Sequence, residues 1–260
     1  MDLAIILDDW PFDAEDEANN IRKIVGLDGT LKLQLRLRDG VVQWQLENRP
    51  DGSRPYGFDS VLAYCRFLLD TRARRGEGRS RGLDQQLIGE LEGELVDYSR
   101  RMAALLKVGD YDRASRDASH GLDVLTLVRE HSSDHSVARE CDRFRPQLVG
   151  ERARAEALLA VRQGQLQGAV EALNRGIDEI GECSADDEGR RAPAHSLHRR
   201  RLIELRRSLR ERHNIPLSDW ELLQSLEAEQ ELAIEKEDFA MAARLRDKMK
   251  LIRDRLDGAG

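Results

Sequence analysis

Aromatic residues and cysteine are scarce in this chain of 260 residues. Aromatics make up 5% of the sequence, against 40% hydrophobic and 35% charged residues. Such a mixture, rich in leucine, alanine, glutamate and arginine, favours helices over β-sandwiches or barrels. The length allows one large or two small domains with a core of their own.

The three cysteines, Cys65, Cys141 and Cys183, lie far apart and form no CxxC pair. This spacing argues against a disulfide framework and against a zinc ribbon, and it favours a reduced, cytoplasmic setting. Long apolar runs are also missing. The run Leu3 to Leu7 has acids on both sides and no basic segment before it, so we expect neither a signal peptide nor a membrane span.

A positive net charge is lacking too, because the formal net charge is −7. Global electrostatics therefore oppose a general attraction to nucleic acid or anionic lipid, although local basic patches can still act. We expect protein partners more than polyanions, and no membrane contact.

No convergent catalytic set is visible, and the phosphate-loop pattern GxxxxGK[ST] is missing. His131, Asp134, His135 and Cys141 are a possible zinc set by residue type alone. Their stretch is rich in serine and aspartate at an expected helix end, which favours a solvated loop. We therefore expect no enzyme activity, no metal and no cofactor.

The N-terminal part, residues 1–71, is predicted to be a small α+β module. Two Asp-Gly turns separate IRKIV, LKLQLRL and VVQWQLE, which indicates a three-stranded antiparallel meander. The second run places four leucines on one face, Leu31, Leu33, Leu35 and Leu37. The helix expected over residues 58–70 is the natural cover for that face.

Residues 72–83 contain five arginines and three glycines, a composition typical of a flexible linker. Residues 84–183 are predicted to be helical and contain an internal repeat with a shift of 55 residues. It aligns Gly109 with Gly164, Ala114 with Ala169 and Gly121 with Gly176. The first pair predicts helix ends and the other two predict close helix packing, while Asp110 is a candidate N-cap.

This repeat resembles the tetratricopeptide repeat (TPR) family. The resemblance covers Gly109, Asp110, Tyr111, Ala114, Gly121 and Leu122, and more weakly Gly164, Ala169, Gly176 and Ile177. Because 55 residues exceed that family's period of about 34, we expect TPR-like helical hairpins with an intervening segment.

A second polar linker is expected over residues 184–195, followed by a basic helix over 196–214 with seven arginines and two glutamates. Leu202, Leu205 and Leu209 form a narrow apolar seam, so we favour a docked helix with a basic outer face. Phosphate contact remains the alternative, with Arg199, Arg200, Arg206 and Arg207 as its candidates.

The last segment, residues 216–257, is predicted to be an antiparallel helical hairpin. Ser218 and Glu221 form a capping box, and Asp238 is a good N-cap for the second helix. The first helix carries an apolar stripe, Trp220, Leu223, Leu226, Ala233 and Ile234. The second carries a seam with coiled-coil spacing, Ala242, Leu245, Met249, Ile252 and Leu256. The two helices differ in charge, with balances of −6 over residues 220–238 and +3 over 239–257.

The hairpin resembles the UVR domain, the UvrB/UvrC motif that also occurs in McsA-type activators and some Clp ATPases. The match includes Leu226, Ala233, Ile234, Glu237, Asp238, Phe239 and the string AARLRD. It implies protein contact with another UVR-containing protein, a kinase or a Clp-type ATPase, or self-association. It also implies a set of contact candidates, Phe239, Ala242, Leu245, Arg246, Asp247 and Met249.

We therefore expect an α+β fold that is mostly α, with a β-meander, TPR-like hairpins and a C-terminal hairpin. The expected function is that of a non-enzymatic adaptor that binds a protein partner. The alternative is a nucleic-acid-associated accessory of excision repair that uses the basic segments together with the hairpin.

Overall fold

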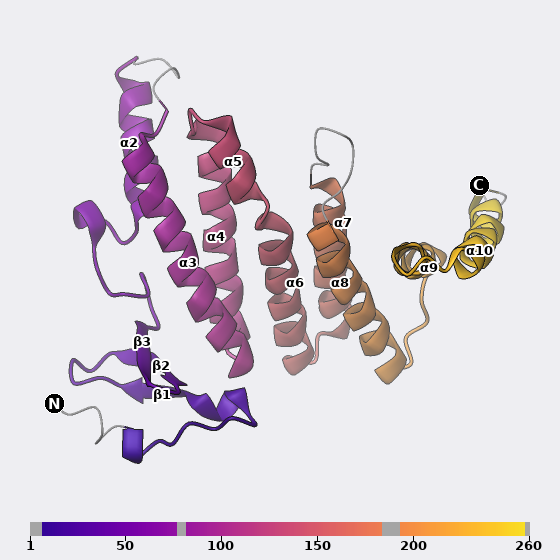
Figure 1. Cartoon of the computed structure of the whole chain (residues 1–260), viewed down its shortest axis with the longest axis horizontal. Coiled ribbons are helices and arrows are strands. Elements are labelled where there is room, and N and C mark those ends of the chain that lie inside the picture. Colours follow the sequence, from indigo (N-terminus) through magenta and orange to yellow (C-terminus); the bar gives the residue numbers. More distant parts are fainter. Residues whose placement is uncertain (1–6, 77–81, 184–192, 258–260) are drawn as a thin grey trace. The chain divides into compact units, whose positions relative to one another are not determined.

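The computed structural model describes residues 7–76, 82–183 and 193–257. Most of the Leu3–Leu7 run, the centre of the first expected linker and nearly all of the second lie outside these ranges. The fold is mostly helical with one small sheet, as predicted (Figure 1). Contacts divide the chain into unit 1, Met1–Glu156, and unit 2, Ala157–Gly260. The division falls inside a helix, whereas the expected boundaries lay in the two linkers.

The sheet of unit 1 is the predicted meander. Its strands are β1 (Ile21–Val25), β2 (Leu31–Leu37) and β3 (Gly40–Gln45), antiparallel in the order β1-β2-β3. In this register Leu33 lies opposite Lys23 on one side and Trp44 on the other. The turn between β1 and β2 contains Gly29 with a φ of +74°, which the Asp-Gly sequence provides.

Both faces of the sheet are partly covered, which differs from the one-sided pattern expected for β2. Leu33 is fully buried, but Leu31 and Leu37 at the two ends are 49% and 45% exposed. On the opposite face Arg36 is buried, and its Nε donates to the Trp10 carbonyl oxygen at 2.9 Å. A short segment around Trp10 therefore covers the face that the alternation marked as solvent-exposed.

The expected covering helix exists as α2 (Val61–Arg74), capped by the Ser60 side chain. It packs on the short 3-10 helix η2 (Pro55–Gly57), on α3 (Gln85–Lys107) and on α4 (Tyr111–His131). The hydrogen bonds that tie the sheet to helices come from α3 and from the corner before α4. Arg101 donates to the Gln45 carbonyl oxygen at 2.7 Å, and Lys23 pairs with Asp110 at 2.6 Å.

The first expected linker is shorter than predicted. Residues 72–74 complete the last turn of α2. Leu83 is buried, and its amide donates to the His131 carbonyl oxygen at 2.9 Å. Segments on both sides of residues 77–81 therefore belong to packed structure.

The helices of the repeat follow the predicted turns. After α3 and α4 come α5 (His135–Asp142), α6 (Arg145–Arg162) and α7 (Leu166–Glu182). Gly109 and Gly164 have φ angles of +69° and +74°, and Ala114 and Ala169 are fully buried. The intervening segment contains the helix α5 instead of only a loop, because the Asp134 side chain accepts from the Ser136 amide and caps it.

Asp110 and Cys141 were both singled out in the sequence, and the structure places each of them. Asp110 occupies the N-cap position of α4 but makes no side-chain capping bond, because its carboxylate accepts from Lys23 and Arg113 instead. Cys141 is buried beside Glu92, and burial raises the pKa of its thiol to about 12. Over the described ranges, no group of three or more His, Cys, Asp or Glu side chains could hold a metal ion.

Unit 2 places its helices side by side in chain order. They are α7, α8 (Pro193–Arg212), α9 (Asp219–Glu235) and α10 (Phe239–Asp257), and each packs on the next. Across residues 7–76, 82–183 and 193–257, no helix combines the length and the apolar character needed to cross a bilayer.

Glu94 of α3 organises unit 1, because its fully buried carboxylate has partners on three segments. It accepts from the Val61 and Leu62 amides at the start of α2, at 2.7 and 3.2 Å. Arg49 lies 3.0 Å and His120 of α4 2.9 Å from its oxygens. Burial acts to raise the pKa of Glu94, but the bonds from His120, Val61 and Leu62 outweigh it and leave the pKa below its usual value.

Replacing Glu94 by glutamine should therefore destabilise unit 1 by about 2–3 kcal/mol, because it removes the charged acceptor of the Val61 and Leu62 amides and leaves Arg49 with Asp51 alone. A carboxyl whose pKa is lower in the folded state contributes fully above its unfolded pKa and loses that contribution as the pH falls. The wild-type free energy of unfolding should fall below about pH 4.5, and Glu94→Gln should flatten this dependence. Urea unfolding between pH 3 and 7 measures both; equal slopes for the two proteins would contradict the assignment.

Gly121 of α4 provides a test of the helix packing. A Cβ atom there would lie 2.9 Å from Leu148 and 3.0 Å from Leu95. Gly121→Ala should lower the free energy of unfolding by about 1 kcal/mol, because overpacking costs about 1–3 kcal/mol and the gain in helix propensity is about 1. The control Gly89→Ala, on an open face of α3 with nothing within 4 Å, should raise stability by about 1 kcal/mol. The same sign for both substitutions would show that Gly121 is not tightly packed.

Candidate partner-binding surface

The corner between α9 and α10 has the same backbone geometry as three earlier helix ends. Gly109, Gly164, Asn214 and Glu237 all adopt positive φ, between +54° and +74°. At each corner the next amide donates back to a carbonyl five residues earlier, as Asp238 does to Ala233 at 2.8 Å. This is the Schellman arrangement, in which glycine is favoured. Glu237 adopts this arrangement as well, although the left-handed conformation is unfavourable for a residue with a Cβ atom.

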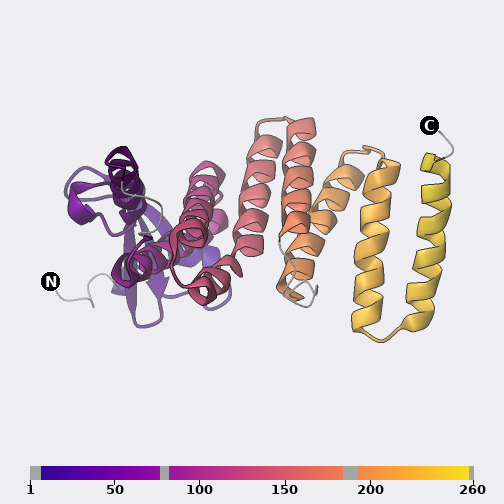
Figure 2. The same ribbon diagram turned by 90° about the horizontal axis from the view of Figure 1, so that it is seen from above.

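Local signals fix both ends of the hairpin as predicted. Ser218 and Glu221 form the capping box at the start of α9, with both reciprocal bonds present. The Asp238 side chain accepts from the Met241 amide at 3.0 Å and so caps α10. Figure 2 shows α9 and α10 side by side, connected by this corner.

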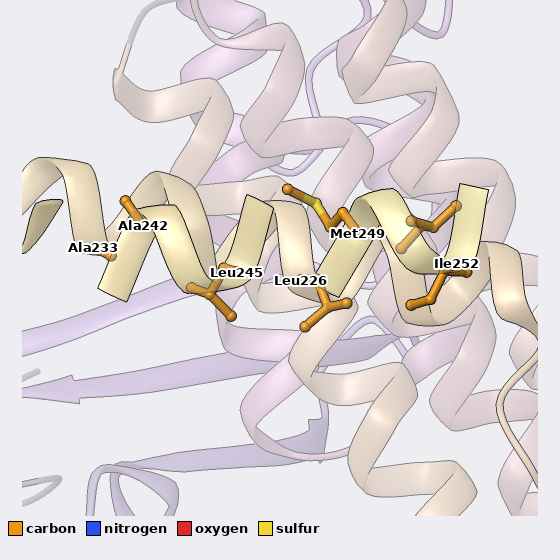
Figure 3. Close-up of a cluster of buried hydrophobic side chains, with 7 residues drawn as sticks. Leu226, Ala233, Ala242, Leu245, Met249 and Ile252 are labelled. Atoms are coloured by element: carbon orange, nitrogen blue, oxygen red, sulfur yellow. The ribbon is translucent and has the colours of Figure 1, made fainter. Parts of the chain in front are cut away.

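The hairpin core takes up half of the predicted contact residues. Leu223, Leu226 and Ala233 of α9 pack against four residues of α10, namely Ala242, Leu245, Met249 and Ile252 (Figure 3). Ala242, Leu245 and Met249 are thus core residues, no more than 7% exposed. The predicted stripe and seam are correct at their centres but not at the ends, because Trp220, Ile234 and Leu256 are 44%, 52% and 42% exposed.

The other predicted contact residues point away from α9. Phe239 is 67% exposed, and the Arg246 and Asp247 side chains, 3.0 Å apart, are each 68% exposed. Helix geometry places a strip of two alanines, an aspartate and a leucine opposite the core seam, and every member is exposed. We call it the outer strip of α10, and it consists of Ala240, Ala243, Asp247 and Leu251.

Cations flank the outer strip on both sides. By helical spacing, Arg244 and Lys248 lie along one edge, while Arg246 and Lys250 lie along the other. Arg244, Lys248 and Lys250 form no ion pair with any described residue. Leu251 in the strip is 67% exposed. The uncovered side of α10 therefore combines a narrow, closely approachable strip with two rows of positive charge.

Three of the four arginines of α8 that were candidates for phosphate contact lie next to glutamates of the neighbouring helix instead. Arg200 pairs with Glu235 at 2.8 Å, Arg207 with Glu229 at 3.2 Å, and Arg199 lies 3.9 Å from Glu227. These glutamates all belong to α9, so the opposite charges of the two helices hold them together. Only modest stabilisation per pair is expected where the side chains are exposed.

Arg206, the fourth phosphate candidate, is fully buried and offers no surface to a phosphate. It donates to Asn174 of α7 at 2.7 Å, and to the Gln224 side chain and the Glu221 carbonyl of α9 at 2.8 and 3.3 Å. Burial lowers its pKa to about 10. The apolar seam of α8 is accordingly Leu202, Ile203 and Leu209 with Arg206 among them, and Leu205 is only partly buried.

Comparisons with known proteins add little to this geometry. No protein-family model matches the chain, and no curated protein matches it. Among solved structures, a chain described as "DHF119 filament" is similar, with a TM-score of 0.41 and 20% sequence identity. The match covers 76% of this chain and 94% of that one.

The corner residue Glu237 gives a direct test of the hairpin geometry. Glu237→Gly should stabilise the hairpin by about 1 kcal/mol, because glycine adopts positive φ without the cost that other residues bear. Lys236→Gly, one residue earlier where φ is −89°, should give no gain. Hydrogen exchange of the α9 and α10 amides measures both variants, and equal protection in the two would contradict the left-handed corner.

Proposed function

We propose that the chain is a non-catalytic adaptor that captures another protein through the outer strip of α10. One observation carries this proposal. α10 packs on α9 with one side, while its opposite side presents Leu251 and small residues between two rows of cations that the described chain leaves largely unpaired. Alanines in such a strip allow a second helix to approach closely.

The partner surface should be an acidic amphipathic helix. Within unit 2, the basic α8 packs on the acidic α9, and Arg253 of α10 pairs with Glu227 of α9 at 3.0 Å. An acidic helix on the far side of α10 would continue this alternation of charge. Complementary charges of this kind raise the association rate and fix the register.

A second copy of the chain is a weaker candidate for this position. Its acidic helix α9 already contributes Glu221, Glu229 and Glu235 to ion pairs with α8. Self-association through α9 would break those pairs. A different protein is therefore favoured, such as the UVR-containing, kinase or Clp-type ATPase partners that the resemblance implies.

The alternative role with nucleic acid has less support. Three of its four arginine candidates on α8 face glutamates of α9, and the fourth is Arg206, which is buried. A polyanion would have to compete with those glutamates for the same cations.

Partner capture by charge-reversed variants tests the proposal. Arg244→Glu with Lys248→Glu should weaken capture by about 10- to 30-fold, since two lost surface attractions of about 0.7–1 kcal/mol each correspond to that range. The matched control reverses two exposed charges elsewhere, Arg212→Glu with Lys236→Glu, and should leave capture unchanged. Affinity capture from a lysate with quantitative mass spectrometry, followed by binding to the purified partner, supplies the measurement.

A second pair of variants separates contact from folding. Phe239→Ala should change stability by less than about 0.5 kcal/mol because the ring is exposed, yet weaken capture. Leu245→Ala should cost about 2–4 kcal/mol of stability because it empties the hairpin core. If the protein with Arg244→Glu and Lys248→Glu and the Phe239→Ala protein both capture the same proteins as wild type, the outer strip is not the interface.

A further inference from the structure

Unit 1 contains an open pocket of about 180 Å³ at the end of the sheet, far in sequence from the hairpin. The segment after β3 contributes one wall, and helices α3 and α4 contribute the others. Apart from Leu46, every residue that lines it is polar or charged: Glu47, Asn48, Tyr98, Arg101, Arg113, Arg116, Asp117 and His120. Nothing in the adaptor role uses this pocket.

Glu47 bridges two arginines at the mouth of the pocket. Arg113 donates to its Oε1 through Nε at 2.9 Å and Nη2 at 2.5 Å, while Arg116 lies 3.5 Å from its Oε2. Asp110 and Asp112 hold the same two guanidinium groups from the other side, at 3.1 and 2.9 Å. Because Glu47 is 56% exposed while Asp110 is 9% exposed, Glu47 is the more readily displaced partner of Arg113.

At the floor of the pocket, the charged side chains already pair with one another. Arg101 forms a bidentate pair with Asp117 at 2.8 and 2.6 Å, and both side chains are about 95% buried. His120 is oriented by Glu94, at 2.9 Å, and stacks on the Tyr98 ring with centroids 3.8 Å apart. Since Arg101 occupies both oxygens of Asp117, the floor has no free carboxylate for a cation.

Tyr98 supplies the observation that points to a ligand. Its side chain is only 6% exposed and lines the pocket, yet its hydroxyl makes no hydrogen bond with any described residue. The ring is buried while the hydroxyl faces the open pocket, so this donor is free to bind a ligand that enters it. A free hydroxyl donor beside two arginines that share one displaceable carboxylate is an arrangement that suits an anion.

We propose that this pocket binds a phosphate monoester, whose oxygens replace the Glu47 carboxylate between Arg113 and Arg116 and accept from the Tyr98 hydroxyl. A phosphate monoester carries about two negative charges and three acceptor oxygens, against one charge and two oxygens for Glu47. The carboxylate of Glu47 is largely exposed, so solvent weakens its ion pairs and its displacement costs little.

A nucleotide base has no platform here, because the Tyr98 ring is already stacked on His120. The ligand class is therefore a phosphate monoester without a base, free or on a peptide side chain. Titration of the full-length chain with O-phosphoserine, AMP or inorganic phosphate at constant ionic strength separates these sources. Amide chemical shifts of residues 111–120 report the binding.

Four variants decide the outcome. Glu47→Gln should tighten O-phosphoserine binding about tenfold, because it removes the competing charge, and Arg116→Gln should weaken binding at least tenfold. Tyr98→Phe should weaken binding severalfold without loss of stability, since its hydroxyl makes no hydrogen bond with the described residues that the substitution would remove. The control Arg66→Gln, an exposed arginine of α2 paired with Asp123, should bind like wild type.

The result that overturns the proposal is specific. It is the absence of saturable shifts with O-phosphoserine or inorganic phosphate in Glu47→Gln up to about 10 mM, or equal weakening by Arg116→Gln and Arg66→Gln, which would show general charge attraction. Tighter binding of AMP than of O-phosphoserine would overturn the assigned ligand class. A fold check by far-UV circular dichroism accompanies each variant.

Discussion

In each unit of the described chain, one fully buried charged side chain joins its own helix to neighbouring segments. In unit 1 it is Glu94, which joins α3 to α2, to α4 and to the loop after the sheet. In unit 2 it is Arg206, which joins α8 to α7 and α9. A buried charge is costly unless its hydrogen bonds are satisfied, so only one arrangement of the surrounding helices is acceptable. With few aromatics to fill wide cores, these two side chains supply much of the specificity of the packing.

The buried hydrogen bonds of Arg206 extend to α9 but no further along the chain. Arg206 reaches α7 and α9 but not α10, which packs on α9 through a seam of three apolar residues of α9 and four of α10. The last helix of unit 2 therefore depends on α9 alone, and no described residue covers its far side. This combination is consistent with an edge that a partner would complete.

Sequence patterns identified the features that depend on neighbours in the chain. Gly109, Gly164, the Ser218–Glu221 box and the Asp238 cap all act within one helical turn, and each lies where it was predicted. Features that depend on distant segments were not visible. Arg206 has the helical spacing of the apolar seam, four positions after Leu202 and three before Leu209, but its polar partners on α7 and α9 could not be deduced from the sequence. Asp110 was expected to cap α4, but Lys23, 87 positions earlier, binds its carboxylate instead.

The hairpin shows why a matching string alone does not identify contact residues. Alternation of three and four positions already assigned Ala242, Leu245 and Met249 to the seam with α9, and a side chain cannot fill that seam and a partner's surface together. The helical repeat of α10 determines where the other three contact candidates lie around the helix. Phe239, Arg246 and Asp247 lie on the arc opposite the seam, beside Leu251 and the unpaired lysines. Glu221, Glu229 and Glu235 of α9 pair with arginines of α8, so the proposed partner would supply the negative charge that faces this arc.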